Sequence, residues 1–247
     1  MSFRLLTYNI RHGGTGREQP LSAVIKACEP DIVILQEATK PEVVERLCAA
    51  SGMQAYASRP RESLAYISRI PIAHHEWHRP RLSRHAFLEV VPEGDNLRVF
   101  GVHLSAVHAA WTERRRVLEL RALLKSIERH QSGFHVLAGD FNTLAPGELL
   151  DVRKLPHRLR ALVWLSGGRI RWQTIRVVLG ARYVDVFRSL HPEDPGLTFP
   201  TWDPHVRLDY FFVPADTRDR AAKCRLVDHP QAKKASDHFP LLTELSI

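Results

Sequence analysis

The sequence is dominated by short runs in which apolar residues follow one another without alternation, separated by stretches with helical spacing. A strand that is apolar on successive residues is buried on both faces, as when helices cover a sheet. Many of these runs are rich in β-branched or aromatic residues, which favours strands. They occupy residues 3–10, 31–36, 64–68, 86–91, 97–104, 134–138, 208–213, 224–227 and 241–245.

Helical patterns lie between these predicted strands, at residues 20–27, 39–50 and 112–130. The longest carries an apolar stripe at 3.6-residue spacing, formed by Val117, Leu120, Leu124 and Ile127. Thr39 and Glu42 stand three residues apart, which predicts a capping box at the start of the second helix. Because strands and helices interleave throughout, we predict an α/β protein with layered sheets.

Length and composition fit an ordinary globular protein. A chain of 247 residues can bury a substantial core and still be one domain. The three cysteines form no CxxC pair, which argues against a disulfide scaffold or a structural zinc site. No apolar run approaches the roughly 18 residues of a membrane span, and the N-terminus has no signal-peptide pattern, so we expect a cytoplasmic protein.

Positive charge is concentrated in one segment. The chain has a formal net charge of +8, and residues 146–182 contain eight Lys or Arg against two acidic residues. Trp164 and Trp172 lie among the aliphatic residues of this segment, and Gly167-Gly168 divides it into two predicted helices. A basic surface favours polyanionic partners such as nucleic acid or anionic lipid headgroups.

Polar residues recur where the predicted strands begin or end. Strand ends are where ligand sites gather in α/β sheets, because rigid elements fix the side chains there. These side chains are hard oxygen donors, amides and imidazoles, which is a ligand set for magnesium or manganese. They are Asn9, Glu37, His103, Asp140, Asn142, Asp209, Asp237 and His238.

Two short motifs within this set are weak when taken alone. Gly139-Asp140-Phe141-Asn142 would also suit a turn, since Gly139 is flexible and Asp140 and Asn142 can cap the next element of the chain. Ser236-Asp237-His238 would also suit a helix N-cap followed by a surface histidine. The ordered set is more specific than either motif.

The ordered set resembles the endonuclease/exonuclease/phosphatase superfamily, the DNase I-like phosphoesterases. The resemblance runs from residue 3 to residue 242 and implies a single domain over 1–247, with a basic insertion at about 146–182. It also implies a four-layered α/β sandwich with two central mixed β-sheets and the site at one edge. The motifs are Thr7-Tyr8-Asn9, Leu35-Gln36-Glu37, Gly101-Val102-His103-Leu104, Gly139-Asp140-Phe141-Asn142, Arg207-Leu208-Asp209-Tyr210 and Ser236-Asp237-His238.

The resemblance implies a metal site and a water-activating group. Glu37 would be the principal carboxylate ligand of Mg²⁺ or Mn²⁺, with Asn9 and Asp237 completing the site. Asp140 would orient or deprotonate the attacking water, and Asn142 would hydrogen-bond the scissile phosphate. The metal and the polar groups around it would neutralise the charge of the phosphodiester, so no covalent nucleophile is needed.

The resemblance also assigns the two imidazoles. His238 would bond a phosphate oxygen or act as the base, so the choice of base between Asp140 and His238 stays open. Asp209 would fix the tautomer of His238. His103 would stabilise phosphate charge or protonate the leaving oxygen. Glu62 would be the carboxylate partner of His103, or else a solvated glutamate at the start of a strand.

Three classes of function compete. We rank first a nuclease or DNA phosphodiesterase, in which Trp202 and the basic side chains of Arg169, Arg171 and Arg176 would bind the substrate. The second is a lipid or small-molecule phosphoester hydrolase, in which residues 160–179 would form an interfacial amphipathic helix on an anionic membrane. The third, a non-catalytic scaffold, is disfavoured because no motif position has been replaced. No obligate protein partner is implied.

Most of the 14 histidines lie outside these motifs. His12 and His108 are close in sequence to Asn9 and His103, and are candidates to line the cleft. For those without a motif we expect surface or packing roles. They are His74, His75, His78, His85, His130, His135 and His157.

Overall fold

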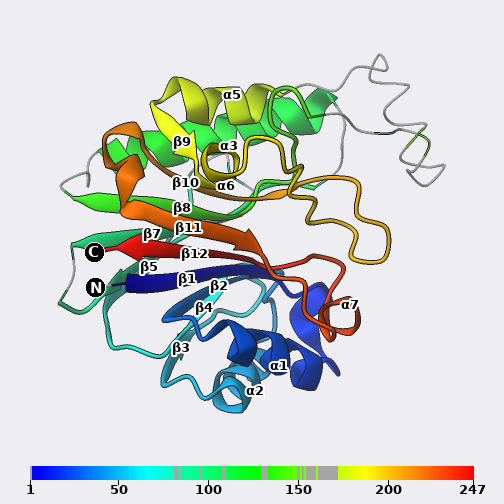
Figure 1. Ribbon diagram of the computed structural model, residues 1–247. Helices are drawn as coiled ribbons and strands as arrows, with labels where there is room; N and C mark the ends of the chain where they lie inside the picture. Colours follow the sequence, from blue (N-terminus) through cyan, green and yellow to red (C-terminus); the bar gives the residue numbers. More distant parts are fainter. Residues whose placement is uncertain are drawn as a thin grey trace.

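The computed structural model describes residues 2–80, 83, 85–94, 96–106, 110–128, 133–148, 151, 153, 160 and 172–247. In this part of the chain, two six-stranded sheets pack face to face and helices cover their outer faces (Figure 1). Both sheets contain parallel and antiparallel pairs. The prediction of a four-layered α/β sandwich with two central mixed sheets is therefore confirmed.

The first sheet has the strand order β11-β12-β1-β2-β4-β3. Its strands are β1 (Ser2–Asn9), β2 (Ile32–Gln36), β3 (Ala55–Ala57), β4 (Ala65–Ser68), β11 (Ala221–Leu226) and β12 (Leu241–Ser246). The helices on its outer face are α1 (Glu18–Cys28), α2 (Pro41–Ser51) and α7 (Ala232–Ala235). Leu21 and Leu47 pack from these helices against the alternate residues Leu6 and Val33 of the strands, which explains why these strands are apolar on both faces.

The second sheet has the order β5-β6-β7-β8-β10-β9. Its strands are β5 (Ile72–His78), β6 (Phe87–Pro92), β7 (Leu97–His103), β8 (Phe134–Asp140), β9 (Tyr183–Asp185) and β10 (Asp209–Pro214). Helices α3 (Ala110–Glu128) and α5 (Gln173–Gly180) pack on its outer face, α3 through the predicted stripe residues Leu120, Leu124 and Ile127. The short elements η1 (His12–Gly14), α6 (Val186–Leu190) and η3 (Ala215–Arg220) complete the described chain.

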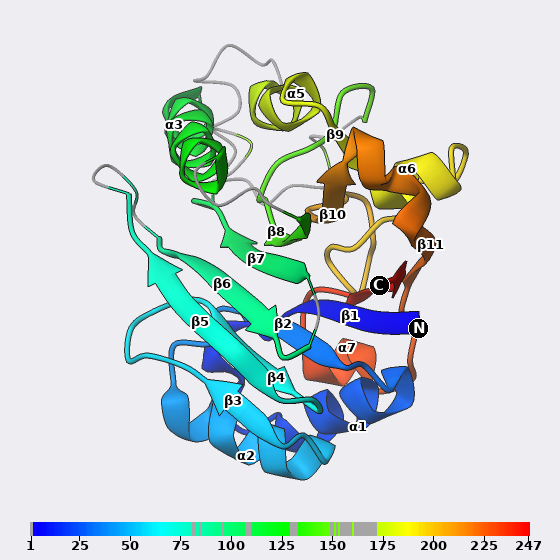
Figure 2. The ribbon, with the colours of Figure 1, turned by 90° about the vertical axis from the view of Figure 1, so that its left-hand side faces the viewer.

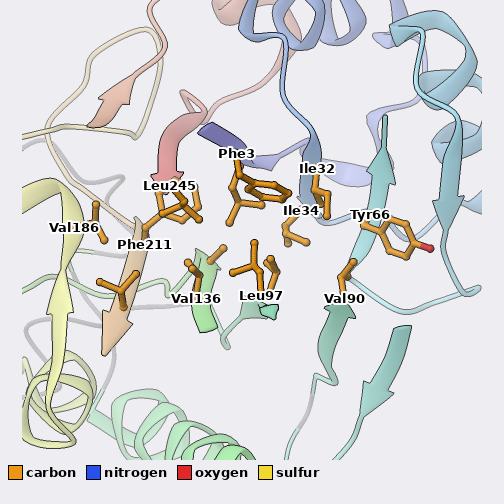
Figure 3. Close-up of a cluster of buried hydrophobic side chains, with 14 of the residues drawn as sticks. Phe3, Ile32, Ile34, Tyr66, Val90, Leu97, Val136, Val186, Phe211 and Leu245 are labelled. Atoms are coloured by element: carbon orange, nitrogen blue, oxygen red, sulfur yellow. The ribbon is translucent and has the colours of Figure 1, made fainter. Parts of the chain in front are cut away.

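The core between the sheets is built from every second residue of each strand. Figure 3 shows Phe3, Ile34, Val136 and Phe211 meeting there, with the other labelled residues around them. A strand sends alternate side chains to opposite faces, so every second residue of a strand faces this core. In β1 and β8 that period leads from core residues to Asn9 and Asp140, which places the polar strand ends at one edge of the apolar layer.

The nine predicted strands are all present, but β3, β5 and β9 were not predicted. β3 and β9 have only three residues each. β5 carries His74, His75, Glu76 and His78, a composition that is not typical of a strand, and it lies at the edge of its sheet, where polar residues are tolerated. Weak local signals therefore account for the three omissions.

The predicted capping box is wrong. Helix α2 begins at Pro41, which occupies the first turn, and Lys40 is the N-cap residue without a side-chain hydrogen bond. Proline suits this position because its missing N–H would have no partner inside the helix. The fixed φ of Pro41 sets the start of the helix instead of Thr39.

Most of the basic segment at residues 146–182 lies outside the described residues. The second of its two predicted helices corresponds to α5, while the first falls outside. The extent of the insertion and the single-domain organisation stay predictions. In the described part of the chain, no helix combines the length and apolarity needed to cross a bilayer.

A buried arginine supports the strand that carries Asp209. Arg207 donates to both carboxylate oxygens of Asp185, at 3.0 and 2.6 Å, and its Nε donates to Glu148 at 2.8 Å. Tyr210 donates to the carbonyl of Thr143 at 2.9 Å. A bidentate arginine–carboxylate pair fixes geometry as well as charge, so these bonds tie the loop after Asn142 to the start of β10.

Gly139 allows β7 and β8 to pair closely enough to align His103 with Asp140. A Cβ at this position would lie 1.9 Å from the carbonyl oxygen of Val102. We expect Gly139→Ala to lower the free energy of unfolding by about 3 kcal/mol or more, because backbone must move to relieve the clash. Urea denaturation followed by circular dichroism measures this loss.

Gly180→Ala is the matched control. Gly180 ends α5, and a Cβ there would meet no atom of the described residues within 4 Å outside its own helix. Alanine should leave stability unchanged or raise it by up to about 1 kcal/mol. Equal effects of the two substitutions would show that the approach of β7 and β8 at Gly139 does not constrain the fold.

Candidate active site

Asp140, at the end of β8, is the centre of the site. Its side chain is 1% exposed. Asn9 Nδ2 donates to its Oδ2 at 3.0 Å, and the backbone N–H of Asn142 donates to its Oδ1 at 2.8 Å. Asn9 belongs to the other sheet, so the bond from Asn9 joins the two sheets at their polar edge.

Two imidazoles face the same carboxylate oxygen. Nε2 of His103 lies 4.0 Å from Asp140 Oδ2, and Nε2 of His238 lies 3.9 Å from it. The parallel register of β7 and β8 pairs His103 with Asp140, and the antiparallel register of β10 and β8 pairs Asp209 with Asp140. Strand pairing therefore assembles three of the predicted site residues directly.

Asp209 orients His238. Its Oδ2 lies 2.9 Å from Nδ1 of the imidazole, so Nδ1 carries a proton and Nε2 is directed at Asp140. Burial alone would lower the pKa of His238, but the charge of Asp209, the hydrogen bond to it and the charge of Asp140 together raise this pKa. This direction favours the protonated form of His238.

The pKa of Asp140 is also raised, which for a carboxyl favours the uncharged form. Burial raises the pKa of this carboxyl, the charge of His238 opposes that rise, and the charge of Asp209 adds to it. Because burial disfavours the charged form of a carboxyl, a cation placed beside Asp140 would favour its carboxylate. The protonation of Asp140 therefore depends on the positive charge placed beside it.

The three predicted metal residues are neighbours. Asn9 Nδ2 lies 3.4 Å from Glu37 Oε1 as well as contacting Asp140. The hydroxyl of Ser236 donates to the backbone carbonyl of Asn9 at 2.6 Å and lies 3.3 Å from Asp237 Oδ1. Asn9 and Ser236 therefore connect Glu37 and Asp237.

The donor set fits a hard divalent cation. Glu37 and Asp237 offer carboxylates that are 31% and 18% exposed, whereas Asp140 is enclosed beside them. Mg²⁺ retains several waters and binds through few carboxylates, so partly exposed groups suit it. Another group of possible metal ligands in the described part consists of Asp140, Asp209 and His238, whose ligand atoms lie within 4.8 Å of one another. In this group Asp209 is already bonded to Nδ1 of His238, so Glu37 is the better candidate for the metal carboxylate.

Asn142 occupies the left-handed region, with φ of 51°. Its backbone N–H is bonded to Asp140, and its Nδ2 donates to the carbonyl of Leu104 at 2.9 Å. The turn interpretation of this motif is therefore correct locally, and the turn also fixes Asp140. A second proton on Nδ2 stays available to an acceptor.

The sequence matches the Endonuclease/Exonuclease/phosphatase family over residues 6–238. The chain belongs to this family. Members of the family are phosphoester hydrolases, so the chain is an enzyme of that class. No curated protein sequence matches the chain.

Solved structures of low sequence identity share the fold. An AP endonuclease from Archaeoglobus fulgidus superposes with a TM-score of 0.74 at 18% identity, covering 99% of this chain and 100% of that one. The 3′ phosphatase NExo from Neisseria, bound to a product DNA hairpin, gives the same values. A family protein from Beutenbergia cavernae gives 0.73 at 20% identity, covering 100% of this chain and 72% of that one.

Within this family fold, the expected role of Glu62 is wrong. The group bonded to Nδ1 of His103 is the hydroxyl of Ser63, the next residue. Glu62 instead accepts from Arg79 at 2.5 Å. Glu62 and Ser63 lie in the loop that precedes β4 (Ala65–Ser68), so the local signal located the partner to within one residue but not its identity.

Trp202 lies beside the site. It is 61% exposed, its ring is 6.5 Å from that of Phe199, and Phe199 is 4.9 Å from the His238 ring. The guanidinium of Arg11 lies 5.9 Å from the Trp202 ring and 3.3 Å from Asp237. The predicted position of Trp202 near the catalytic groups is thus supported, while its binding role stays a prediction.

The other predicted binding residues are less well placed by the structure. Arg169 and Arg171 lie outside the described residues, as does His108. Arg176 is in α5, with its guanidinium 5.7 Å from the Trp172 ring. His12 lies at the edge of the site as expected, with its backbone N–H 2.5 Å from Glu37 Oε2.

Among the described residues near the site, those not predicted include Arg11, Ser63, Phe199, Ser236 and His85, whose ring stacks on His103. Ser236 stands inside a recognised motif, and Arg11 follows Asn9 by two residues, so proximity in sequence was an available signal for both. Ser63 carried no such signal, because a single serine next to a charged residue forms no recognisable motif. Its role depends on the fold that brings it to His103.

Ser63→Ala tests the assignment of the His103 partner. Loss of the hydroxyl frees the ring to rotate, so we expect kcat for bis-p-nitrophenyl phosphate to fall by roughly tenfold, with KM little changed. Glu62→Gln, at the adjacent position, should leave kcat near that of the unaltered enzyme. Ser63→Thr keeps the hydroxyl and should restore activity; a larger loss in Glu62→Gln than in Ser63→Ala would reverse the assignment.

Proposed function

We propose that this enzyme is a divalent-metal-dependent phosphodiesterase that hydrolyses DNA by direct attack of water. The observation that carries the proposal is the arrangement around Asp140. A buried carboxylate is anchored by Asn9 and faces His103 and His238 at 4.0 and 3.9 Å. This places a proton acceptor next to two groups that can stabilise an anionic phosphate.

Each group has a distinct part in the proposed reaction. Asp140 orients the attacking water and accepts its proton, because its second oxygen is fixed by the backbone of Asn142. His238, kept protonated by Asp209, stabilises charge on a phosphate oxygen. His103 stabilises the phosphate from the other side or protonates the leaving oxygen. This assigns Asp140 rather than His238 as the base.

Glu37, Asn9 and Asp237 would hold the Mg²⁺ or Mn²⁺ ion. Such an ion supplies Lewis-acid neutralisation of charge on the phosphate. Glu37 is already fixed for this purpose, since it accepts from the backbone of His12 and from Asn9. Its own backbone is in the left-handed region at φ of 56°, which the surrounding bonds maintain.

Two features favour DNA as the substrate. Trp202 offers a largely exposed ring next to the catalytic groups, suited to stacking on a base. The net charge of +8 favours a polyanion. The structural neighbours include an AP endonuclease and a phosphatase bound to a DNA hairpin, which supports the same class of substrate.

The lipid hydrolase alternative has less support. It depended on an interfacial helix at residues 160–179, most of which lie outside the described residues. In the described part, Ile175 and Val178 of α5 are fully buried against the α3 side of the second sheet. Apolar residues already packed in the protein are not available to a membrane.

The substrate proposal is tested by incubating the enzyme with plasmid, duplex and single-stranded DNA in Mg²⁺, in Mn²⁺ and in EDTA. We expect cleavage of at least one DNA substrate with metal and none in EDTA. Cleavage of a phospholipid, with every DNA substrate intact, would support the alternative instead. Bis-p-nitrophenyl phosphate serves as the positive control for active enzyme.

Asp140→Asn and His238→Ala test the mechanism. Each should lower kcat at least about a hundredfold, because each removes a group assigned to proton transfer or charge stabilisation. Asp140→Asn should stay folded at the assay temperature with some loss of Tm, since the amide keeps the shape of the carboxyl but can accept only one of the bonds from Asn9 and Asn142. Turnover close to that of the unaltered enzyme in either variant would remove that residue from the mechanism.

The basic segment is tested through the salt dependence of DNA binding. Replacing Arg169, Arg171 and Arg176 together with Gln should flatten the slope of log Kd against log salt concentration, because fewer counterions are released. The triple substitution Arg218→Gln, Arg220→Gln and Arg225→Gln removes equal charge elsewhere and is the control. An unchanged slope in the first variant would give the segment a structural role only.

A further inference from the structure

A second cluster of metal-ligating side chains lies on the edge strand β5. His74, Glu76 and His78 are separated by two residues each, so they project from the same face of the strand. Glu89 on β6 pairs directly with Glu76 in the antiparallel register. Four groups that bind metals or protons are therefore gathered on two neighbouring strands.

This face is the outer one, away from the catalytic centre. The residues between these positions point to the other side: Trp77 packs in the core between the sheets, and His75 contacts the rings of Tyr66 and Trp77. Leu88 and Val90 flank Glu89 and also belong to that core. The cluster therefore faces outward from β5 and β6, which run beside each other in Figure 2.

The groups lie close enough to share one ion. Nε2 of His74 is 3.7 Å from Glu76, and one ligand atom from each of His74, Glu76 and Glu89 falls within 4.8 Å of the others. His74 and Glu76 are about half exposed at 53% and 54%, whereas the side chain of Glu89 is 3% exposed. An entering ion would find one buried anchor and two accessible ligands.

Glu89 is held in place from both sides. Its Oε2 lies 2.7 Å from Nε2 of His78, and its Oε1 accepts from the guanidinium of Arg98. Ligating carboxylates are commonly fixed by hydrogen bonds of this kind from groups outside the ligand set. Arg98 offsets one of the two carboxylate charges of Glu76 and Glu89, and the imidazole of His78 lies beside both carboxylates.

We propose that His74, Glu76 and Glu89 form a second divalent-cation site, suited to zinc and separate from the catalytic centre. One imidazole and two carboxylates, with water in the fourth position, make a tetrahedral N/O site of the zinc type. The imidazole distinguishes it from the oxygen-rich environment of Glu37. The ion would link β5 to β6 and stabilise a polar edge strand that has a neighbour on one side only among the strands of the described chain.

Zinc binding is measured in a background that lacks Glu37 and Asp237, the two carboxylates assigned to the catalytic metal. The Glu37→Gln, Asp237→Asn variant is stripped with EDTA, the EDTA is removed, and the protein is titrated with Zn²⁺ in competition with a chromogenic chelator. We expect one equivalent to bind. Adding His74→Ala or Glu76→Gln should weaken this binding at least about tenfold.

His75→Ala in the same background is the matched control. It removes an imidazole from the adjacent position, but one that projects from the opposite face, so zinc binding should be unchanged. Equal binding in the His74→Ala and His75→Ala proteins would overturn the proposal, as would the absence of a bound equivalent in the background variant. Glu89 would then be an anchor for His78 and Arg98 only.

Thermal unfolding gives a second readout that does not depend on the chelator. Zn²⁺ should raise the Tm of the background variant and of its His75→Ala form, and should leave the Tm of its His74→Ala form unchanged. With the catalytic residues intact, His74→Ala alone should retain phosphodiesterase activity in Mg²⁺. A Tm rise of equal size in all three background proteins would place the bound zinc elsewhere.

Discussion

The hydrogen bond from Asn9 to Asp140 joins the two sheets at an edge where the layer between them becomes polar. Each strand contributes to that layer through alternate residues, so the face that carries Phe3 and Leu5 also carries Asn9, and the face that carries Val136 and Ala138 also carries Asp140. The site is therefore the continuation of the core. Its geometry is set by the packing of the sheets.

This continuity explains how charged groups are tolerated out of solvent. A buried carboxylate is costly unless it is hydrogen-bonded and paired, and Asp140 and Asp209 lie next to each other at the ends of paired strands. His238 separates their charges by bonding Asp209 and facing Asp140. One oxygen of Asp209, Oδ1, has no hydrogen-bond partner among the described residues.

Sequence predicted nine of the described strands and the residues that meet around Asp140, because both depend on strong local signals. Consecutive apolar residues marked the doubly covered strands, and each motif stood at a strand end, where residues such as His103 and Asp140 meet by register. The hydrogen-bond partners of Ser63 and Arg207 could not be foreseen, since these partners are distant in sequence and are brought close by packing. Thr39 is not the cap because the fixed φ of Pro41 sets the first turn of α2, which makes Lys40 the N-cap residue.

The histidines of β5 show why residue type alone does not predict a role. His74 and His75 are adjacent residues of the same type. The two-residue period of the strand directs His74 to the outer face beside Glu76 and His75 to the opposite face against Trp77. His103, Asp140 and the outer cluster are sorted by the same period in the second sheet. Once β5 is recognised as a strand and its register with β6 is known, Glu89 completes the outer cluster, and the fold itself separates a candidate structural metal site from the hydrolytic one.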